Sequence, residues 1–303
     1  MSGTAKQNKT QLKGVLMLLL TALVWGSSFV AQSIGMEKIQ AFTFTAVRTI
    51  LGALVLLPII LIRGKIRSTK VFGKKTLWYG LILGIIFSFA QNFQQFAFYY
   101  STSGKIAFVT ALYMFFVPIF GIFLRKRIPF LTWLCVIAGF VGLYFLCMNP
   151  SDLTAINKGD ILAFICAIFY AVHILVIERF APEVDGIELS CVQFAVASVI
   201  SFVLMFIFET PQIPAIISAG PSLAYSGIMS CGLAYTFQII GQKYTEATVA
   251  SLLMCTESVF AVITAAIVLH EMLTGREIIG CTIMFIAIVV SQVSESPSGK
   301  RAA

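Results

Sequence analysis

Ten stretches of mostly apolar residues fill the 303-residue chain and leave only short polar breaks between them. A helix rises about 1.5 Å per residue, so roughly 20 residues are needed to cross a hydrocarbon core about 30 Å thick. Most of the stretches reach this length, and the shorter ones lie among neighbours that do. The chain is therefore predicted to be an all-α polytopic membrane protein with ten transmembrane helices, at residues 14–33, 42–62, 77–98, 106–124, 131–148, 161–178, 190–208, 216–241, 247–269 and 276–293.

The composition excludes a soluble domain. Charged residues make up 11% of the chain, against about 25% in soluble proteins. The formal net charge of +8 does not indicate a nucleic-acid partner, because the basic residues lie at the ends of the predicted helices rather than among aromatic residues on a solvated face. The lipid bilayer is the expected partner.

Lysine and arginine residues predict the orientation in the membrane. If the ten helices alternate in direction, 16 of the 21 basic residues lie on the side of the N-terminus, and Arg48 lies within a helix. The positive-inside rule then places both termini in the cytoplasm of a multi-pass protein of the plasma or inner membrane. The first stretch is too long for a cleavable signal peptide, so it is expected to remain as the first helix. Only four basic residues are predicted outside: Lys38, Lys105, Lys158 and Arg276.

No pattern in the sequence predicts an enzyme, a metal site or a cofactor. The seven cysteines lie in apolar stretches without a Cys-x-x-Cys pair or a histidine cluster, so they are interpreted as small buried side chains. The sequence has no phosphate-binding glycine loop and no Ser/His/Asp arrangement, and its polar breaks are too short to hold an active site.

The chain divides into two units of five predicted helices. Residues 149–160 form the longest polar break on the outer side, between units at 14–148 and 161–293, and the cytoplasmic tails are residues 1–13 and 294–303. Because each unit has an odd number of helices, the two have opposite orientations, an inverted repeat that is common in secondary transporters. At an offset of 144, a few residues of the first unit recur in the second: Phe93, Gln94, Tyr100, Phe116 and Ile119 as Phe237, Gln238, Tyr244, Phe260 and Ile263.

Several short motifs resemble those of a known family. They are ALVWGSSF at residues 22–29, Arg48, ALY at 111–113, and ESVFA at 257–261 followed by HEMLT at 270–274. With these motifs the chain resembles the EamA-type members of the drug/metabolite transporter superfamily. The resemblance implies a ten-helix carrier with a central cavity between two inverted repeats, often exporting amino acids, other metabolites or drugs.

Two departures from the family pattern stand out. Ser258 replaces the proline that usually follows the glutamate in the second repeat, so the sequence lacks the residue that would predict a helix break at that point. Lys126 and Arg127 replace the usual Gly-Glu of the first repeat, which strengthens the cytoplasmic anchor and removes an acidic side chain.

Glu257 and His173 are the candidates for proton coupling. Glu257 is near the middle of the ninth predicted helix, where a charged carboxylate costs a few kcal/mol or more. It is interpreted either as a group that exchanges a proton or binds a substrate amine, or as a hydrogen-bonded carboxyl that joins two helices. His173 in the sixth helix is interpreted either as a proton relay or as a structural hydrogen-bonding group.

The other candidates are expected to bind substrate. Gln91, Gln94 and Gln95 share one helix face by their i, i+3, i+4 spacing, and lipid does not tolerate so many amides. They line a cavity or bond neighbouring helices. Arg48 is interpreted as a partner of a substrate carboxylate or a protein carbonyl, or as a side chain that reaches to the membrane surface. Four further residues complete this set: Trp25, whose neighbours also favour close helix packing, Tyr113, which aligns with Glu257, and Tyr235 and Gln238 of the second repeat.

These residues predict a secondary transporter that moves a small polar or amphipathic metabolite by alternating access, with a proton gradient as the hypothesised driving force. The alternatives are an uptake carrier of the same fold and a membrane scaffold or sensor that transports nothing.

Overall fold

A bundle of long helices makes up the computed structural model, which describes residues 2–148, 156–269 and 274–295. Every regular element in these ranges is helical, and nine candidate spans are long and apolar enough to cross a membrane. Residues 149–155 of the predicted linker and 270–273 of the HEMLT motif lie outside the described residues. The chain is an all-helical, multi-pass membrane protein.

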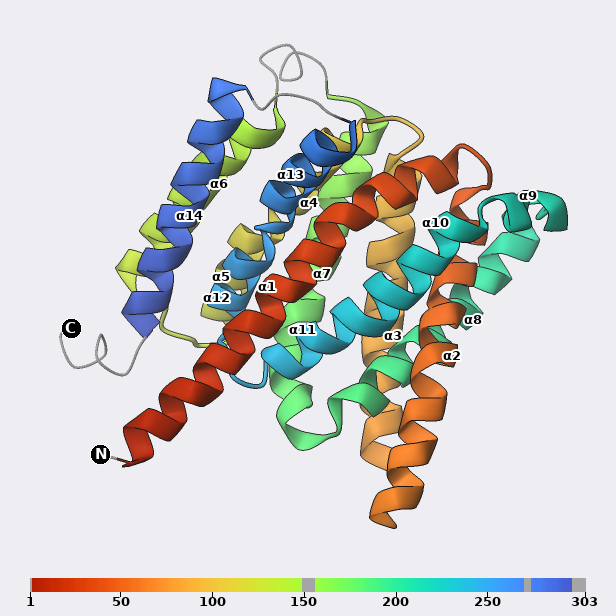
Figure 1. Ribbon diagram of the computed structural model, residues 1–303, viewed down its shortest axis with the longest axis horizontal. Coiled ribbons are helices and arrows are strands. Elements are labelled where there is room, and N and C mark those ends of the chain that lie inside the picture. The colour runs from red at the N-terminus through yellow and green to blue at the C-terminus, as the bar shows by residue number, and fades with distance from the viewer. Residues whose placement is uncertain (1, 149–155, 270–273, 296–303) are drawn as a thin grey trace.

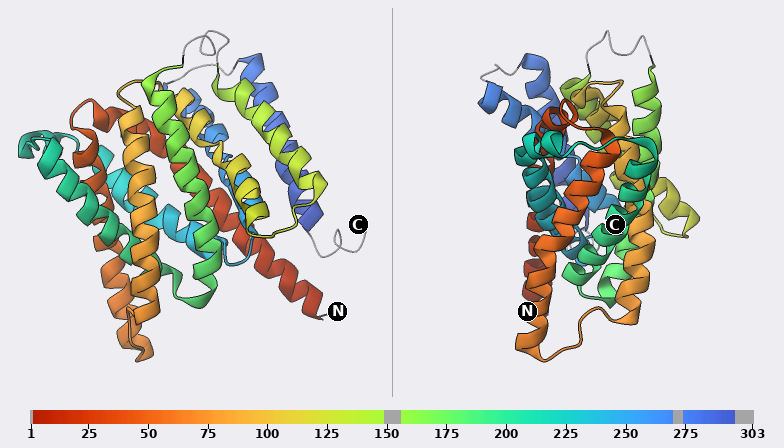
Figure 2. Two further views of the ribbon diagram at one scale, coloured as in Figure 1. Left: turned by 180° about the vertical axis from the view of Figure 1, so that it is seen from behind. Right: turned by 90° about the vertical axis from the view of Figure 1, so that its right-hand side faces the viewer.

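The helices form one bundle, in which α1 runs obliquely while α2 and α3 stand closer to upright in the view of Figure 1. The α6 and α14 helices pack together at one edge of the bundle, and α2 and α8 pack together toward the other, as the view from behind also shows (Figure 2). The beginning of α1 and the end of α14 lie at the same end of the bundle (Figure 1). The long elements are α1 (Ser2–Met36), α2 (Ala41–Arg67), α3 (Lys74–Ala97), α6 (Phe130–Cys147), α7 (Lys158–Phe180), α8 (Gly186–Phe208) and α14 (Gly275–Glu295).

Polar residues at the helix ends fix where the apolar stretches begin. Asn157 and Asp160 form a reciprocal capping box at the start of α7. Asp185 accepts hydrogen bonds from the backbone N–H groups of the first turn of α8 and pairs with Arg63 at 3.1 Å. Burial opposes ionisation of Asp185, but these hydrogen bonds and the arginine lower the pKa of its carboxyl. Glu209 of the loop after α8 accepts the backbone N–H groups of Phe42 and Thr43, in the first turn of α2, at 2.7 Å.

The fourth and ninth predicted spans are each broken in two. The fourth consists of α4 (Ser103–Thr110) and α5 (Tyr113–Phe123), and the ninth of α12 (Ala247–Met254) and α13 (Glu257–Leu269). At both junctions the backbone bonds three residues back, from Met114 to Ala111 and from Ser258 to Cys255, which tightens the chain into a short turn. The second break therefore forms although Ser258 stands where the resemblance to the family implies a proline.

The eighth predicted span, residues 216–241, is not one continuous α-helix. Residues 216–218 belong to α9 (Ile213–Ser218), and the rest of the span is built from α10 (Gly220–Ala224), the π-helix η3 (Tyr225–Tyr235) and α11 (Thr236–Gly241). Pro221, which has no backbone N–H and favours the first turn of a helix, stands near the start of α10. The π-helix is longer than the single-turn bulges that are usual inside α-helices. Its last residue, Tyr235, contributes to the central cavity described below.

Glycines allow two pairs of helices to touch backbone to backbone. A Cβ atom at Gly26 of α1 would lie 2.4 Å from the carbonyl oxygen of Glu257 on α13. A Cβ atom at Gly142 of α6 would lie 2.8 Å from the carbonyl oxygen of Gly280 on α14. A Cβ atom at Gly280 would lie 2.7 Å from the carbonyl oxygen of Gly142. Small residues favour such close contacts in membranes, where dispersion replaces the hydrophobic effect between helices.

Candidate functional site

A small cavity lies in the centre of the bundle, between the two broken spans and helices α1, α2, α3, α7, η3 and α11. Its volume is about 30 Å³, which is room for about two water molecules. Eight of the ten residues predicted from the sequence line it: Trp25, Arg48, Gln91, Gln94, Tyr113, Tyr235, Gln238 and Glu257. A bound metabolite would require these helices to move apart.

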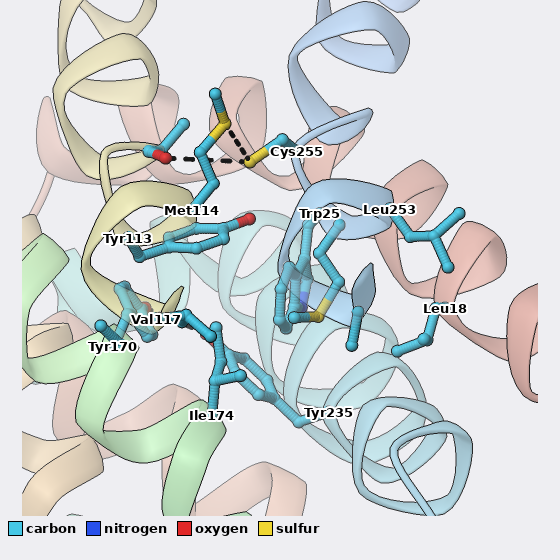
Figure 3. Packing of buried hydrophobic residues seen from close by; sticks show 14 of the residues in the cluster. Leu18, Trp25, Tyr113, Met114, Val117, Tyr170, Ile174, Tyr235, Leu253 and Cys255 are labelled. Atoms are coloured by element: carbon cyan, nitrogen blue, oxygen red, sulfur yellow. Dashed lines mark hydrogen bonds between the residues drawn. The ribbon is translucent and has the colours of Figure 1, made fainter. Parts of the chain in front are cut away.

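Three polar side chains meet in a hydrogen-bonded group on one wall of the cavity. Gln91 of α3 donates through Nε2 to the hydroxyl groups of Tyr170 on α7 and Tyr235 on η3, and the two hydroxyl oxygens are 3.0 Å apart. The ring of Trp25 lies against that of Tyr235, with centroids 4.4 Å apart. Figure 3 shows these aromatic side chains converging from α1, α7 and η3. The wall therefore offers both π-faces and hydroxyl groups.

The two helix breaks place Tyr113 and Glu257 at the cavity. Each is the first residue of the helix after its turn, Tyr113 in α5 and Glu257 in α13. The Glu257 side chain is buried, with a residue exposure of 4%. Within the described residues, its carboxyl group makes no hydrogen bond or ion pair with another side chain. A buried carboxyl group without a partner is energetically unfavourable, which favours a functional over a structural interpretation.

Arg48 of α2 is the cationic group of the cavity. The residue is 2% exposed, and its Nη1 donates to Oε1 of Gln32 on α1 at 2.8 Å. The guanidinium carbon lies 5.6 Å from the centroid of the Phe44 ring. The Nε and Nη2 atoms are buried and have no hydrogen-bond partner in the described part of the chain. The arginine therefore stays inside the bundle rather than reaching the membrane surface.

Two predicted site residues, Gln95 and His173, are not among those that line the cavity. Gln95 is fully buried, and neither of its amide atoms has a hydrogen-bond partner among the described residues. The Nε2 atom of His173 lies 3.0 Å from Oε1 of Gln193 on α8, and its ring packs against Phe87. These contacts join α7 to α8 and α3, while Nδ1 of His173 is buried and has no hydrogen-bond partner among the described residues.

The structure adds cavity residues that the sequence analysis missed, above all Gln32 and Tyr170. Each is a polar side chain inside an apolar stretch, Gln32 near the end of α1 and Tyr170 in the middle of α7. Such isolated polar residues inside predicted spans are the signal that identifies them, since lipid-facing positions rarely carry amides. The cavity is also lined by Ser28, Phe29, Thr110, Ile174 and Ser230.

A second, larger cavity lies at the end of the bundle opposite the start of α1. Its volume is about 330 Å³, and the ends of α4, α6 and α14 contribute to its lining. Phe29 of α1 lines both cavities and is 5% exposed. On this side the phenylalanine ring therefore lies between the central cavity and the larger one.

The family model for the EamA-like transporter family matches the chain twice, at residues 12–148 and 157–292. An uncharacterized transporter of Archaeoglobus fulgidus is 26% identical over 274 residues, covering 90% of this chain and 83% of its own length. The uncharacterized transporter YoaV of Bacillus subtilis is 23% identical over 290 residues, covering 92% of this chain and 96% of its own length. A crystal structure with 18% identity, covering 95% of this chain and 98% of the other, has the same fold, with a TM-score of 0.77.

These matches confirm the resemblance that the sequence motifs indicated. Two copies of one family model span almost the whole chain, and the relatives align over nearly their full lengths. The chain is a membrane transporter and belongs to the EamA-like transporter family.

Proposed function

We propose that the protein is a secondary transporter of the plasma or inner membrane that exports a small polar or amphipathic metabolite, amino acid-like or drug-like, by alternating access. The observation that carries this proposal is the central cavity, where neither Arg48 nor Glu257 forms an ion pair with a described residue, although both are buried deep inside an apolar bundle. Buried charges of this kind are costly and mark substrate or ion pathways in membrane proteins. A scaffold that transports nothing does not require buried charges of this kind.

The contacts between helices support two inverted repeats of five helices each. A twofold axis would relate residues that are 144 positions apart, and such pairs touch directly: Gln91 donates to Tyr235, and the Sγ of Cys255 lies 3.8 Å from the carbonyl oxygen of Ala111. The packing follows the same relation. The α1 helix packs against α13, and its counterpart in the second repeat, α7, packs against α4 and α5. In the same way, α3 packs against α7, and its counterpart η3 packs against α1. We propose that α14 is the tenth transmembrane helix.

The distribution of basic residues supports cytoplasmic termini. The described basic residues at the bundle end where α1 begins include Arg63, Arg67, Lys74 and Lys126, and the positive-inside rule assigns that end to the cytoplasm. In this orientation the larger cavity and Phe29 lie on the outer side of the central cavity. Phe29 then acts as the outer barrier of a closed state, and its movement away from α4 opens the path by which the substrate leaves.

Transport is tested by comparing metabolites in the medium of cells that overproduce the chain with those of cells that lack it. Compounds enriched in the medium are then offered to the purified protein in lipid vesicles. Saturable exchange of at least one enriched compound is expected, and the side on which it accumulates distinguishes export from uptake. Folded protein without saturable exchange of any enriched compound would assign the chain to the scaffold or sensor class.

Cysteine labelling is expected to separate two neighbouring glutamines of α3. In a background without the seven native cysteines, Gln94→Cys should react with a membrane-impermeant thiol reagent, because Gln94 lines the cavity. Gln95→Cys should not react, because Gln95 is fully buried away from that lining. The labelled fraction is measured with reagent on either side of the membrane, and Phe29→Ala should accelerate labelling of position 94 from the outer side.

Two exposed loop positions serve as controls for orientation. Thr102→Cys, between α3 and α4, should be labelled only from outside, and Ser68→Cys, after α2, only from the cytoplasm. Labelling of position 68 from outside would contradict the proposed topology. Equal labelling of positions 94 and 95 would contradict the assigned rotation of α3. Protection of both positions from each side would mean that the amides of α3 only join helices.

A further inference from the structure

One edge of the Arg48 guanidinium group has no hydrogen-bond partner among the described residues. A guanidinium group donates five hydrogen bonds, and the pair formed by Nε and Nη2 is the edge that binds both oxygens of a carboxylate side by side. In this protein Nη1 is occupied by Gln32, whereas Nε and Nη2 are buried and donate to no described residue. The free edge therefore has the geometry of a carboxylate receptor.

Gln32 holds this edge in place. Its Oε1 accepts from Arg48, while its Nε2 donates to the carbonyl oxygen of Ser28, one turn earlier on α1, at 3.3 Å. Both ends of the amide are thus engaged, and the guanidinium group is tied to the backbone of α1 through one intermediate side chain. Because donors that are fixed in advance lose little entropy on binding, this arrangement favours a ligand that completes the hydrogen bonds.

No residue in the described part of the chain supplies an anion to Arg48. Within the described residues, the ion pairs of the other arginines lie at the cytoplasmic end, where Arg63 pairs with Asp185 and Arg179 with Glu183. Glu257 lines the same cavity but is not within ion-pair distance of Arg48. A guanidinium group buried in a bundle without a countercharge costs several kcal/mol, so a bound anion would remove an unfavourable term as well as add hydrogen bonds.

We infer that Arg48, positioned by Gln32, forms a carboxylate-binding subsite, so that the transported metabolite carries a carboxylate group. This inference rests on the proposed transport function and adds the chemical class of the substrate. A planar, singly charged carboxylate matches the free edge of one arginine in both shape and charge. A phosphate dianion would bring a second negative charge for which the cavity, with Glu257 on its other side, offers no further cation among the lining residues.

The test measures ligand-induced stabilisation of the purified protein in lipid nanodiscs. The probes are the proteinogenic amino acids and short mono- and dicarboxylic acids, each beside its primary amide, together with methylphosphonate. At least one acid should raise the unfolding temperature in a saturable way, while its amide, with the same shape and no charge, should not. Arg48→Lys keeps a charge but loses the two-pronged edge, so it should weaken binding of that acid at least tenfold.

Gln32→Glu provides a readout that a merely structural arginine would not give. The new carboxylate would pair with Arg48 in place of the substrate, so the empty protein should unfold at a higher temperature while affinity for the acid falls at least tenfold. Arg63→Lys is the matched control, since Arg63 pairs with Asp185 outside the cavity, and it should leave the affinity for the acid unchanged.

Several outcomes would overturn the inference. They are equal stabilisation by acid and amide, preference for methylphosphonate, full binding of the acid to Arg48→Lys, and a panel in which no acid stabilises the protein. If a compound without a carboxylate is nevertheless exchanged across vesicles, the proposed transport function stands and only the subsite is wrong. Absence of exchange for every compound would count against the transport function itself.

Discussion

Replacing Glu257 by Gln is expected to abolish flux that is driven by a pH gradient while substrate binding survives. The amide has the shape and hydrogen-bonding capacity of the carboxyl group, but it cannot take up and release a proton. Glu257 lines the cavity without a partner among the described side chains, so its charge state is free to change with the state of the transporter. The measurement is uptake into vesicles under an imposed pH gradient, set beside exchange of labelled for unlabelled substrate without a gradient.

The exchange measurement serves as the internal control of Glu257→Gln. Exchange should continue at a rate within a few-fold of wild type, because it needs the substrate site and the conformational change but no net proton movement. Glu246→Gln is the matched variant, since Glu246 is exposed at the start of α12, on the same broken span. Unchanged pH-driven flux in Glu257→Gln would assign this carboxyl to structure and leave facilitated diffusion as the mechanism.

The apolar stretches predict the fold well because each must satisfy its own backbone hydrogen bonds in lipid. Whatever their tertiary contacts, stretches of this length become helices in a membrane. The breaks at Ala111 and Cys255 are different. Neither residue is followed by a proline or glycine in the turn itself, so local preference does not predict an interruption. Packing against α7 and α1 accompanies these turns, and such contacts are not visible in a single sequence.

The sequence predicted which types of residue form the candidate site, but it did not predict how each helix is rotated about its own axis. A polar stripe with i, i+3, i+4 spacing is wide, and the sequence cannot say which of its edges faces the cavity. The rotation of α3 is fixed by Gly80 and Gly84, where a Cβ atom would lie 2.4 and 2.6 Å from atoms of Val192 and Val196 on α8. This contact places Gln94 on the cavity lining and leaves Gln95 outside it.

The bond from Arg48 to Gln32 could not be predicted for a related reason. The two residues lie on different helices, and their separation along the chain carries no periodic signal. The sequence analysis identified Arg48 from the family motifs and from its place within an apolar stretch, and both can be recognised without knowledge of its partner. Recognition of its partner, and hence of the free edge of the guanidinium group, required the packing of α1 against α2.

Gly26→Ala is expected to destabilise the protein and to abolish transport, although alanine favours helices by about 1 kcal/mol over glycine. The added Cβ atom would lie 2.4 Å from the carbonyl oxygen of Glu257 and 2.7 Å from the backbone nitrogen of Ala261. These are backbone atoms that no side-chain rotation can move, so α13 must shift away from α1. Overpacking of this kind costs about 1–3 kcal/mol or more, which outweighs the gain in helix propensity.

The same shift would act on the cavity, because its lining residues Trp25 and Ser28 lie within two positions of Gly26 on α1, and Glu257 begins α13. Gly104→Ala is the matched control: its Cβ atom would lie no closer than 3.5 Å to another atom outside its own helix turn, so helix propensity alone should leave the protein equally or slightly more stable. Unfolding temperature and exchange are measured for both variants. A Gly26→Ala protein that matches Gly104→Ala in both would contradict the backbone contact between α1 and α13, and with it the position of Glu257 beside the substrate path.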